Sequence, residues 1–169
     1  MCSSDLEDPV LYWEHKKLYR SIKDELPDGE EVITEIGRAH VAREGGDVTA
    51  ITFGYLLHET LKAAETLAGD GIEVEVIDLR TLLPLDTPTI LESVAKTGKA
   101  VVIHEAPKIG GIGGEIAAIL AEECFWELDA PVKRLTGFNT SFPAAKSMED
   151  YYMPDADEIA DALRTTAET

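Results

Sequence analysis

Apolar and polar residues follow one another in blocks along most of the chain, and the blocks predict strands and helices in turn. The apolar run at residues 48–53 is typical of a strand. Apolar residues then recur at spacings of four, three and four positions, which predicts one face of a helix. These residues are Leu57, Leu61, Ala64 and Ala68. The Gly-Asp-Gly sequence at residues 69–71 ends this helix, and residues 72–77 alternate like a strand with one covered face.

The second half of the chain continues the same alternation. Asp86, with Pro88 two residues later, predicts the start of a helix that ends at Gly98. Residues 100–103 are apolar without alternation, as expected of an interior parallel strand buried on both faces. A glycine cluster at residues 110–114 leads into another helix, and residues 132–135 predict a last strand. Asp155 and Glu158 then have the spacing of a capping box, which predicts the start of a terminal helix.

Regular alternation of strand and helix predicts an α/β fold with three layers, in which helices cover both faces of a mostly parallel sheet. A domain boundary is expected near residues 24–34, where a polar stretch contains a Pro-Asp-Gly turn signal. Upstream of it, residues 9–13 are expected to form one short buried strand. We therefore divide the chain into residues 7–33, a remnant of another domain with a linker, and residues 34–169, the α/β domain.

The net charge of the chain excludes some classes of binding partner. The 169 residues include 33 acidic and 15 basic side chains, for a formal net charge of −18. Such a surface repels phosphate backbones and anionic lipids, so nucleic acid and membrane are not expected as partners. No apolar run reaches the roughly 20 residues of a membrane helix, and no signal peptide is recognisable, so we expect a cytoplasmic protein. Two interpretations of the acidity remain open: adaptation to high intracellular salt, and a docking face for a basic partner.

Known catalytic and metal-binding motifs do not match this sequence. The glycine cluster begins a GxGxxG motif, but Ile116 stands at the third glycine position. Neither His-Glu pair continues to HExxH, and no G-x-S-x-G elbow is present. Cys124 lies on an apolar helical stripe and is expected to be a buried, inert thiol. The glycines could present free N–H groups to a small anion, or they could allow close packing within the chain or against another subunit. Glu115, at the start of the following helix, argues against the anion.

Several segments resemble one enzyme family in both content and order. The sequence is similar, over residues 7–169, to the C-terminal part of the β subunit of thiamine-diphosphate-dependent 2-oxo acid dehydrogenases, the pyruvate and branched-chain E1 components. The segments that carry the resemblance are residues 8–20, 44–49, 76–86, 96–99, 104–107, 110–116, 122–125 and 129–134. Residues 139–143, Asn-Thr-Ser-Phe-Pro, depart from the family's usual Asp-Thr-Pro-Phe-Pro. Residues 1–6 do not fit the pattern, and we interpret them as a non-native scar.

The resemblance implies a transketolase C-terminal fold and an assembly role in oxidative decarboxylation of a 2-oxo acid, with acyl transfer to lipoamide. In that family two α and two β subunits bind thiamine diphosphate and Mg²⁺ through other domains. The resemblance therefore implies no catalytic, cofactor-binding or metal-binding residue in this chain, which is expected to be inactive alone, with Asp8 at most a remnant of a monovalent-cation site. The equivalent domain of another thiamine enzyme, such as a transketolase, and a stand-alone module for a small anionic ligand remain alternatives.

The implied partners are the E1 α subunit, a second β subunit and the basic subunit-binding domain of the acyltransferase E2. The implied subunit interface surrounds the glycine cluster. Its residues are His104, Glu105, Pro107, Gly110, Gly111, Gly113, Gly114 and Ile116. If this is so, a bulky residue at Gly111 or Gly113 should weaken dimerisation more than it weakens folding of the single chain.

Overall fold

A five-stranded sheet forms the centre of the protein in a computed structural model that describes residues 13–23 and 34–169. The order across the sheet is β1-β3-β2-β4-β5. Only β1 is antiparallel to its neighbour, and β2, β3, β4 and β5 run parallel. The strands are β1 (His40–Arg43), β2 (Val48–Thr52), β3 (Val74–Asp78), β4 (Ala100–Pro107) and β5 (Lys133–Gly137). The predicted mostly parallel sheet is confirmed.

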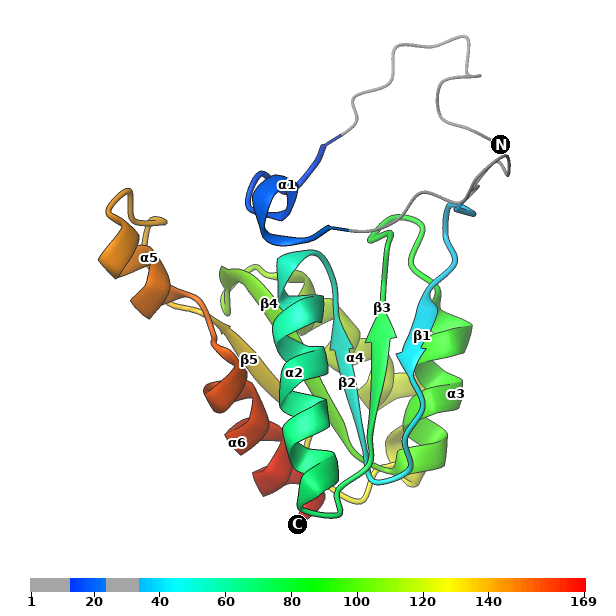
Figure 1. The fold of residues 1–169 in the computed structure, drawn as a ribbon. Helices are drawn as coiled ribbons and strands as arrows, with labels where there is room; N and C mark the ends of the chain where they lie inside the picture. Colours follow the sequence, from blue (N-terminus) through cyan, green and yellow to red (C-terminus); the bar gives the residue numbers. More distant parts are fainter. Residues whose placement is uncertain (1–12, 24–33) are drawn as a thin grey trace, which may run out of the picture.

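Helices cover both faces of this sheet, so the three predicted layers are confirmed (Figure 1). On one face, α2 (Tyr55–Gly69) and α6 (Ala156–Ala167) enclose one buried cluster; on the other, α3 (Thr87–Thr97) and α4 (Ile112–Glu123) enclose a second. Shorter elements lie at the periphery. They are α1 (Leu18–Ser21), the 3₁₀ helix η2 (Phe125–Glu127) and α5 (Lys146–Tyr152), the last of which stands away from the body of the sheet in Figure 1.

The predicted helix ends are where the sequence signals place them. Asp86 is the N-cap of α3, and its carboxylate accepts hydrogen bonds from the Thr89 backbone N–H and hydroxyl. Gly98 ends the same helix in the left-handed conformation, with a φ of 69°. Asp155 and Glu158 form the predicted capping box at the start of α6. These signals depend on neighbouring residues only, which is why the sequence locates them well.

One predicted burial pattern is wrong, and a second is only partly right. Strand β3 was expected to have one covered face, but both faces are buried, and Glu75 is only 2% exposed. The Glu75 carboxylate accepts hydrogen bonds from Ser93 and Lys96 of α3, so this polar position of the alternation is paired inside the fold rather than solvated. In α2 the buried face is offset by about one residue from the predicted one, because the helix packs against both the sheet and α6. The buried residues of α2 are Leu56, Thr60, Ala63, Ala64 and Leu67.

The antiparallel edge strand β1 was not predicted. It has four residues, and its pairing with β3 shifts register between Val41 and Arg43. So short and irregular a strand leaves no periodic signal in the sequence. Residues 9–12 of the predicted buried strand and nearly all of the predicted boundary at residues 24–34 lie outside the described residues. Trp13, the last residue of that predicted strand, is in no strand and is 87% exposed, so its predicted burial is wrong.

Candidate functional site

The predicted site residues gather where β4 ends and α4 begins. His104 is on β4 and is 1% exposed, and its Nε2 accepts a hydrogen bond of 3.2 Å from the Gly113 backbone N–H in the first turn of α4. The residue that precedes α4 is Gly111, which has no side chain to cap the helix. His104 therefore satisfies, from a neighbouring strand, one of the N–H groups that a helix start leaves without a partner.

This contact also determines the protonation of His104. Burial lowers the pKa of the His104 imidazole, and the nearby backbone of Ala106 opposes this shift. The opposing effect is weak, because Nδ1 makes no hydrogen bond of ordinary geometry with a described residue. An Nε2 that accepts a hydrogen bond carries no proton, so the ring is neutral. A neutral, buried imidazole that already holds a helix end has a structural role in this chain.

Gly111 and Gly113 are needed because His104 lies against them. A Cβ atom on Gly113 would be 2.6 Å from His104 Nε2, and one on Gly111 would be 2.5 Å from the Pro107 carbonyl oxygen and 2.6 Å from His104 Cε1. Both conflicts arise within one chain. We expected a bulky residue here to act mainly on dimerisation, through a steric conflict between two chains. That reason is wrong, because the conflict arises within the single chain.

Three of the predicted interface residues are not on the surface of the folded chain. Ile116 is fully buried in the cluster between the sheet and α4, and His104 and Gly113 are also buried. The expectation that these three residues lie at a subunit interface is therefore corrected: α4 turns Gly113 and Ile116 towards the sheet, and His104 of β4 points under the start of α4. The predicted residues that keep some exposure are Glu105, Pro107, Gly110, Gly111 and Gly114.

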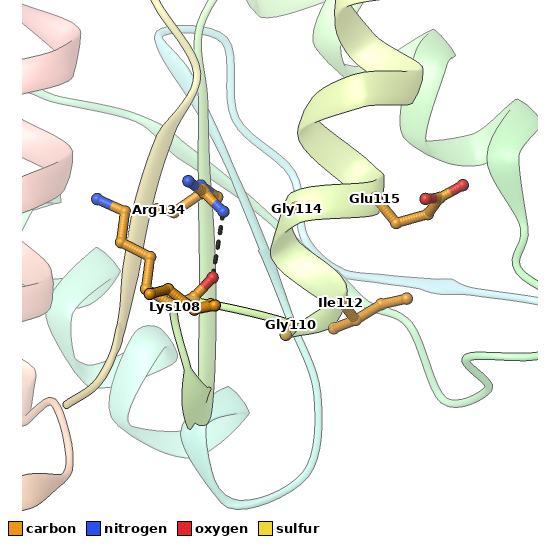
Figure 2. Close-up of a pocket in the computed structure, with 8 residues that line it drawn as sticks. Lys108, Gly110, Ile112, Gly114, Glu115 and Arg134 are labelled. Atoms are coloured by element: carbon orange, nitrogen blue, oxygen red, sulfur yellow. Dashed lines mark hydrogen bonds between the residues drawn. The ribbon is translucent and has the colours of Figure 1, made fainter. Parts of the chain in front are cut away.

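Beside them is an open groove of about 840 Å³ between the first turn of α4 and β5. Lys108 and Arg134 line it, and Arg134 Nη1 donates to the Lys108 carbonyl oxygen at 3.3 Å. Figure 2 shows these two basic side chains on one side of α4 and the Glu115 carboxylate pointing away from them. The predicted objection to an anion, the charge of Glu115, is thus weaker than expected, and anion binding in this groove stays a prediction.

A second exposed feature was missed in the sequence. Trp126, in η2, is 88% exposed and makes an edge contact with the neighbouring Phe125 ring, at 5.0 Å between centroids. Three exposed glutamates flank this aromatic pair in the sequence: Glu122, Glu123 and Glu127. The sequence contained a signal for this exposed surface. Two aromatic residues stand side by side among glutamates, directly after Cys124, where the apolar stripe of α4 ends.

The described part of the chain contains no group of three or more His, Cys, Asp or Glu side chains that could hold a metal ion. Asp8, the predicted cation-site remnant, lies outside the described residues. Within residues 13–23 and 34–169, no helix is long and apolar enough to cross a membrane. Cys124 is buried as predicted, and burial raises the pKa of its thiol, so it is not an activated nucleophile.

Comparison with protein families gives a match over residues 37–159 to the transketolase, C-terminal domain. The chain belongs to this family. The transketolase C-terminal domain of this chain is also similar in structure to a split-gene transketolase described as an inactive beta4 tetramer. The TM-score is 0.71 at 28% sequence identity, covering 85% of this chain and 47% of that one.

Two curated relatives of this transketolase C-terminal domain are dehydrogenase subunits. It is 48% identical over 163 residues to the 2-oxoisovalerate dehydrogenase subunit beta of Bacillus subtilis, covering 96% of this chain and 50% of that protein. It is 45% identical over 161 residues to the pyruvate dehydrogenase E1 component subunit beta of Staphylococcus epidermidis, covering 95% and 49%. The chain spans about half the length of the curated relatives it matches.

Proposed function

We propose that this chain is the C-terminal assembly domain of the β subunit of a 2-oxo acid dehydrogenase E1 component. The complete enzyme would decarboxylate a 2-oxo acid on thiamine diphosphate and transfer the acyl group to a lipoyl arm. The observation that carries the proposal is the 48% identity, over 96% of the chain, with a branched-chain dehydrogenase β subunit. The split-gene transketolase is less similar, at 28% identity, which favours the dehydrogenase over another thiamine enzyme.

Within this enzyme the chain would supply shape rather than chemistry. Its buried histidine at the carboxyl end of the sheet holds a helix start, and the described residues offer no metal-ligand cluster. We therefore derive no catalytic step through this chain, and propose that thiamine diphosphate and Mg²⁺ bind to the complete assembly through other residues. The α subunit and a second β subunit are the proposed partners, contacting the predicted interface residues that keep some exposure, such as Glu105, Pro107 and Gly110. The cytoplasmic location stays a prediction.

A chimera tests the proposal. We expect this chain, placed in the 2-oxoisovalerate dehydrogenase subunit beta of Bacillus subtilis in place of the half it matches, to co-purify with the α subunit of that enzyme and to support decarboxylation of a 2-oxo acid. The chain alone should show no turnover and no binding of thiamine diphosphate by calorimetry. A chimera that is folded by circular dichroism but remains without the α subunit would contradict the assembly role.

The exposed pair Phe125 and Trp126 is the surface that we propose for the acyltransferase. Aromatic side chains that are exposed in the free protein are common energetic centres of interfaces, and the glutamates around them complement a basic subunit-binding domain. Some of the acidic residues behind the net charge of −18 would then form a docking face for the acyltransferase. Adaptation to high salt stays the second interpretation, for the remaining acidic residues.

We expect Trp126→Ala to weaken binding of the acyltransferase subunit-binding domain by about tenfold to a hundredfold, the usual range for loss of a central interface tryptophan. Surface plasmon resonance with the assembled E1 component measures it. Trp13→Ala is the matched control, because Trp13 is 87% exposed and belongs to a different part of the chain. Equal losses for the two variants would remove the aromatic pair from the docking surface.

A further inference from the structure

Parallel α/β sheets usually bind ligands at one point, beyond the carboxyl ends of the strands where the strand order reverses. In this sheet β2 lies between β3 and β4, and the connecting helices α2 and α3 lie on opposite faces. The reversal therefore falls between β2 and β4. Tyr55 begins α2, the helix that follows β2, and Glu105 lies near the end of β4, so these two residues belong to the strand ends at which this fold is expected to bind a ligand.

The chain's own residues 13–23 lie across this position, and Figure 1 shows α1 above the start of α2. His15 Nε2 is 2.9 Å from one carboxylate oxygen of Glu105 and 3.1 Å from the other. The His15 ring also stacks on Tyr55, with 5.9 Å between centroids. Lys17 Nζ lies 3.8 Å from the centroid of the same Tyr55 ring. One histidine thus contacts both Tyr55 and Glu105, and a cation covers the Tyr55 ring.

These contacts are of moderate strength. A hydrogen bond to a carboxylate and a cation–π contact of partly exposed groups each change an equilibrium by only a few fold. The closed arrangement also has a cost, because His15 Nδ1 is buried and has no hydrogen-bond partner among the described residues. A buried nitrogen without a partner favours the open state, in which water can reach it. The segment is therefore held in place by a small balance of free energy.

We propose that residues 13–23 form a displaceable strap that closes the ligand crevice of this fold, with His15 as the group that fills it. While the strap is in place, His15 holds the Glu105 carboxylate, the Glu105 side chain is only 28% exposed, and the crevice is closed to small ligands. A partner surface that competes for Tyr55 or Glu105 releases the strap and exposes both residues. This inference rests on the contacts of residues 13–23 and not on the proposed function, so it stands or falls separately.

Two variants that change only the strap test the proposal. We expect His15→Ala to increase the rate at which a water-soluble carbodiimide and glycine ethyl ester modify Glu105 by about tenfold, as measured by peptide mass spectrometry. Lys17→Ala should give a smaller increase, of about threefold. In both variants the backbone amides of residues 18–23 should exchange hydrogen faster, while those of β2 and β4 keep their wild-type rates.

Lys16→Ala is the matched control, because Lys16 is an exposed cation between the two contact residues. It should leave both the modification rate and the amide exchange unchanged. Equal modification of Glu105 in wild type and His15→Ala would overturn the proposal, as would faster exchange of residues 18–23 without any change at Glu105. The second outcome would mean that the segment moves but does not close the crevice.

Discussion

Gly113→Ala is expected to lower the free energy of unfolding by about 2–4 kcal/mol, although alanine ordinarily favours a helix over glycine by roughly 1 kcal/mol. The added methyl group would lie 2.6 Å from His104 Nε2 and 3.0 Å from Cδ2 of the same ring. His104 is buried and cannot swing away from it. The substitution therefore forces α4 away from β4 and breaks the hydrogen bond between the Gly113 N–H and the imidazole.

Gly114→Ala, one residue later in the same turn, is the control. Its Cβ would be 3.4 Å from Arg134 Nη1, the end of a flexible side chain, so we expect no loss and a gain of up to about 1 kcal/mol. Urea denaturation of both variants measures the difference. A His104→Ala background should reduce the cost of Gly113→Ala, because the conflicting ring is gone. Equal stability of the two single variants would refute the packing explanation.

Glu75→Gln is expected to lower the free energy of unfolding by about 2–3 kcal/mol at neutral pH. The Glu75 carboxylate is buried and accepts hydrogen bonds from Ser93, Lys96 and the Gly45 backbone N–H. An amide has one acceptor oxygen in place of two, so its NH₂ group must face one of these donors. The loss should appear in urea denaturation of the purified chain.

The effect of Glu75 should depend on pH with a defined sign. Burial by itself raises the pKa of this carboxyl, but the hydrogen bonds from Lys96 and Ser93 outweigh burial and hold the pKa below its ordinary value of 4.5. The unfolded chain therefore binds more protons in this range. The stabilisation is complete above about pH 4.5 and is lost as the pH falls through the lowered pKa.

The stability difference between wild type and Glu75→Gln should accordingly shrink as the pH is lowered from 7 to about 3. Glu44→Gln is the control, because Glu44 also pairs with Lys96 but is 81% exposed, and we expect its effect at neutral pH to stay within about 1 kcal/mol. A difference that is the same at every pH would mean that Glu75 acts by packing and not by its charge.

The glycine cluster illustrates what a sequence can and cannot locate. Its position after a buried strand marked it as a special backbone segment, and here the structure places α4 close against the His104 ring of β4. The partner of Gly113 could not be inferred, because His104 precedes it by nine residues and its side-chain direction depends on the strand face. Ile116 was expected at a subunit interface, but it is fully buried because the register of α4, which packing decides, turns it towards the sheet.

The sequence by itself determined the order of strands and helices, the caps at Asp86, Gly98 and Asp155, and the resemblance to the family, because these depend on neighbouring residues or on the chain read as a whole. The tertiary structure alone decided which polar groups are paired. Glu75 meets Lys96 across 21 residues, and His15 meets Glu105 across 90. Such pairs form when strands and helices pack at a particular register, and local propensity contains no information about that register.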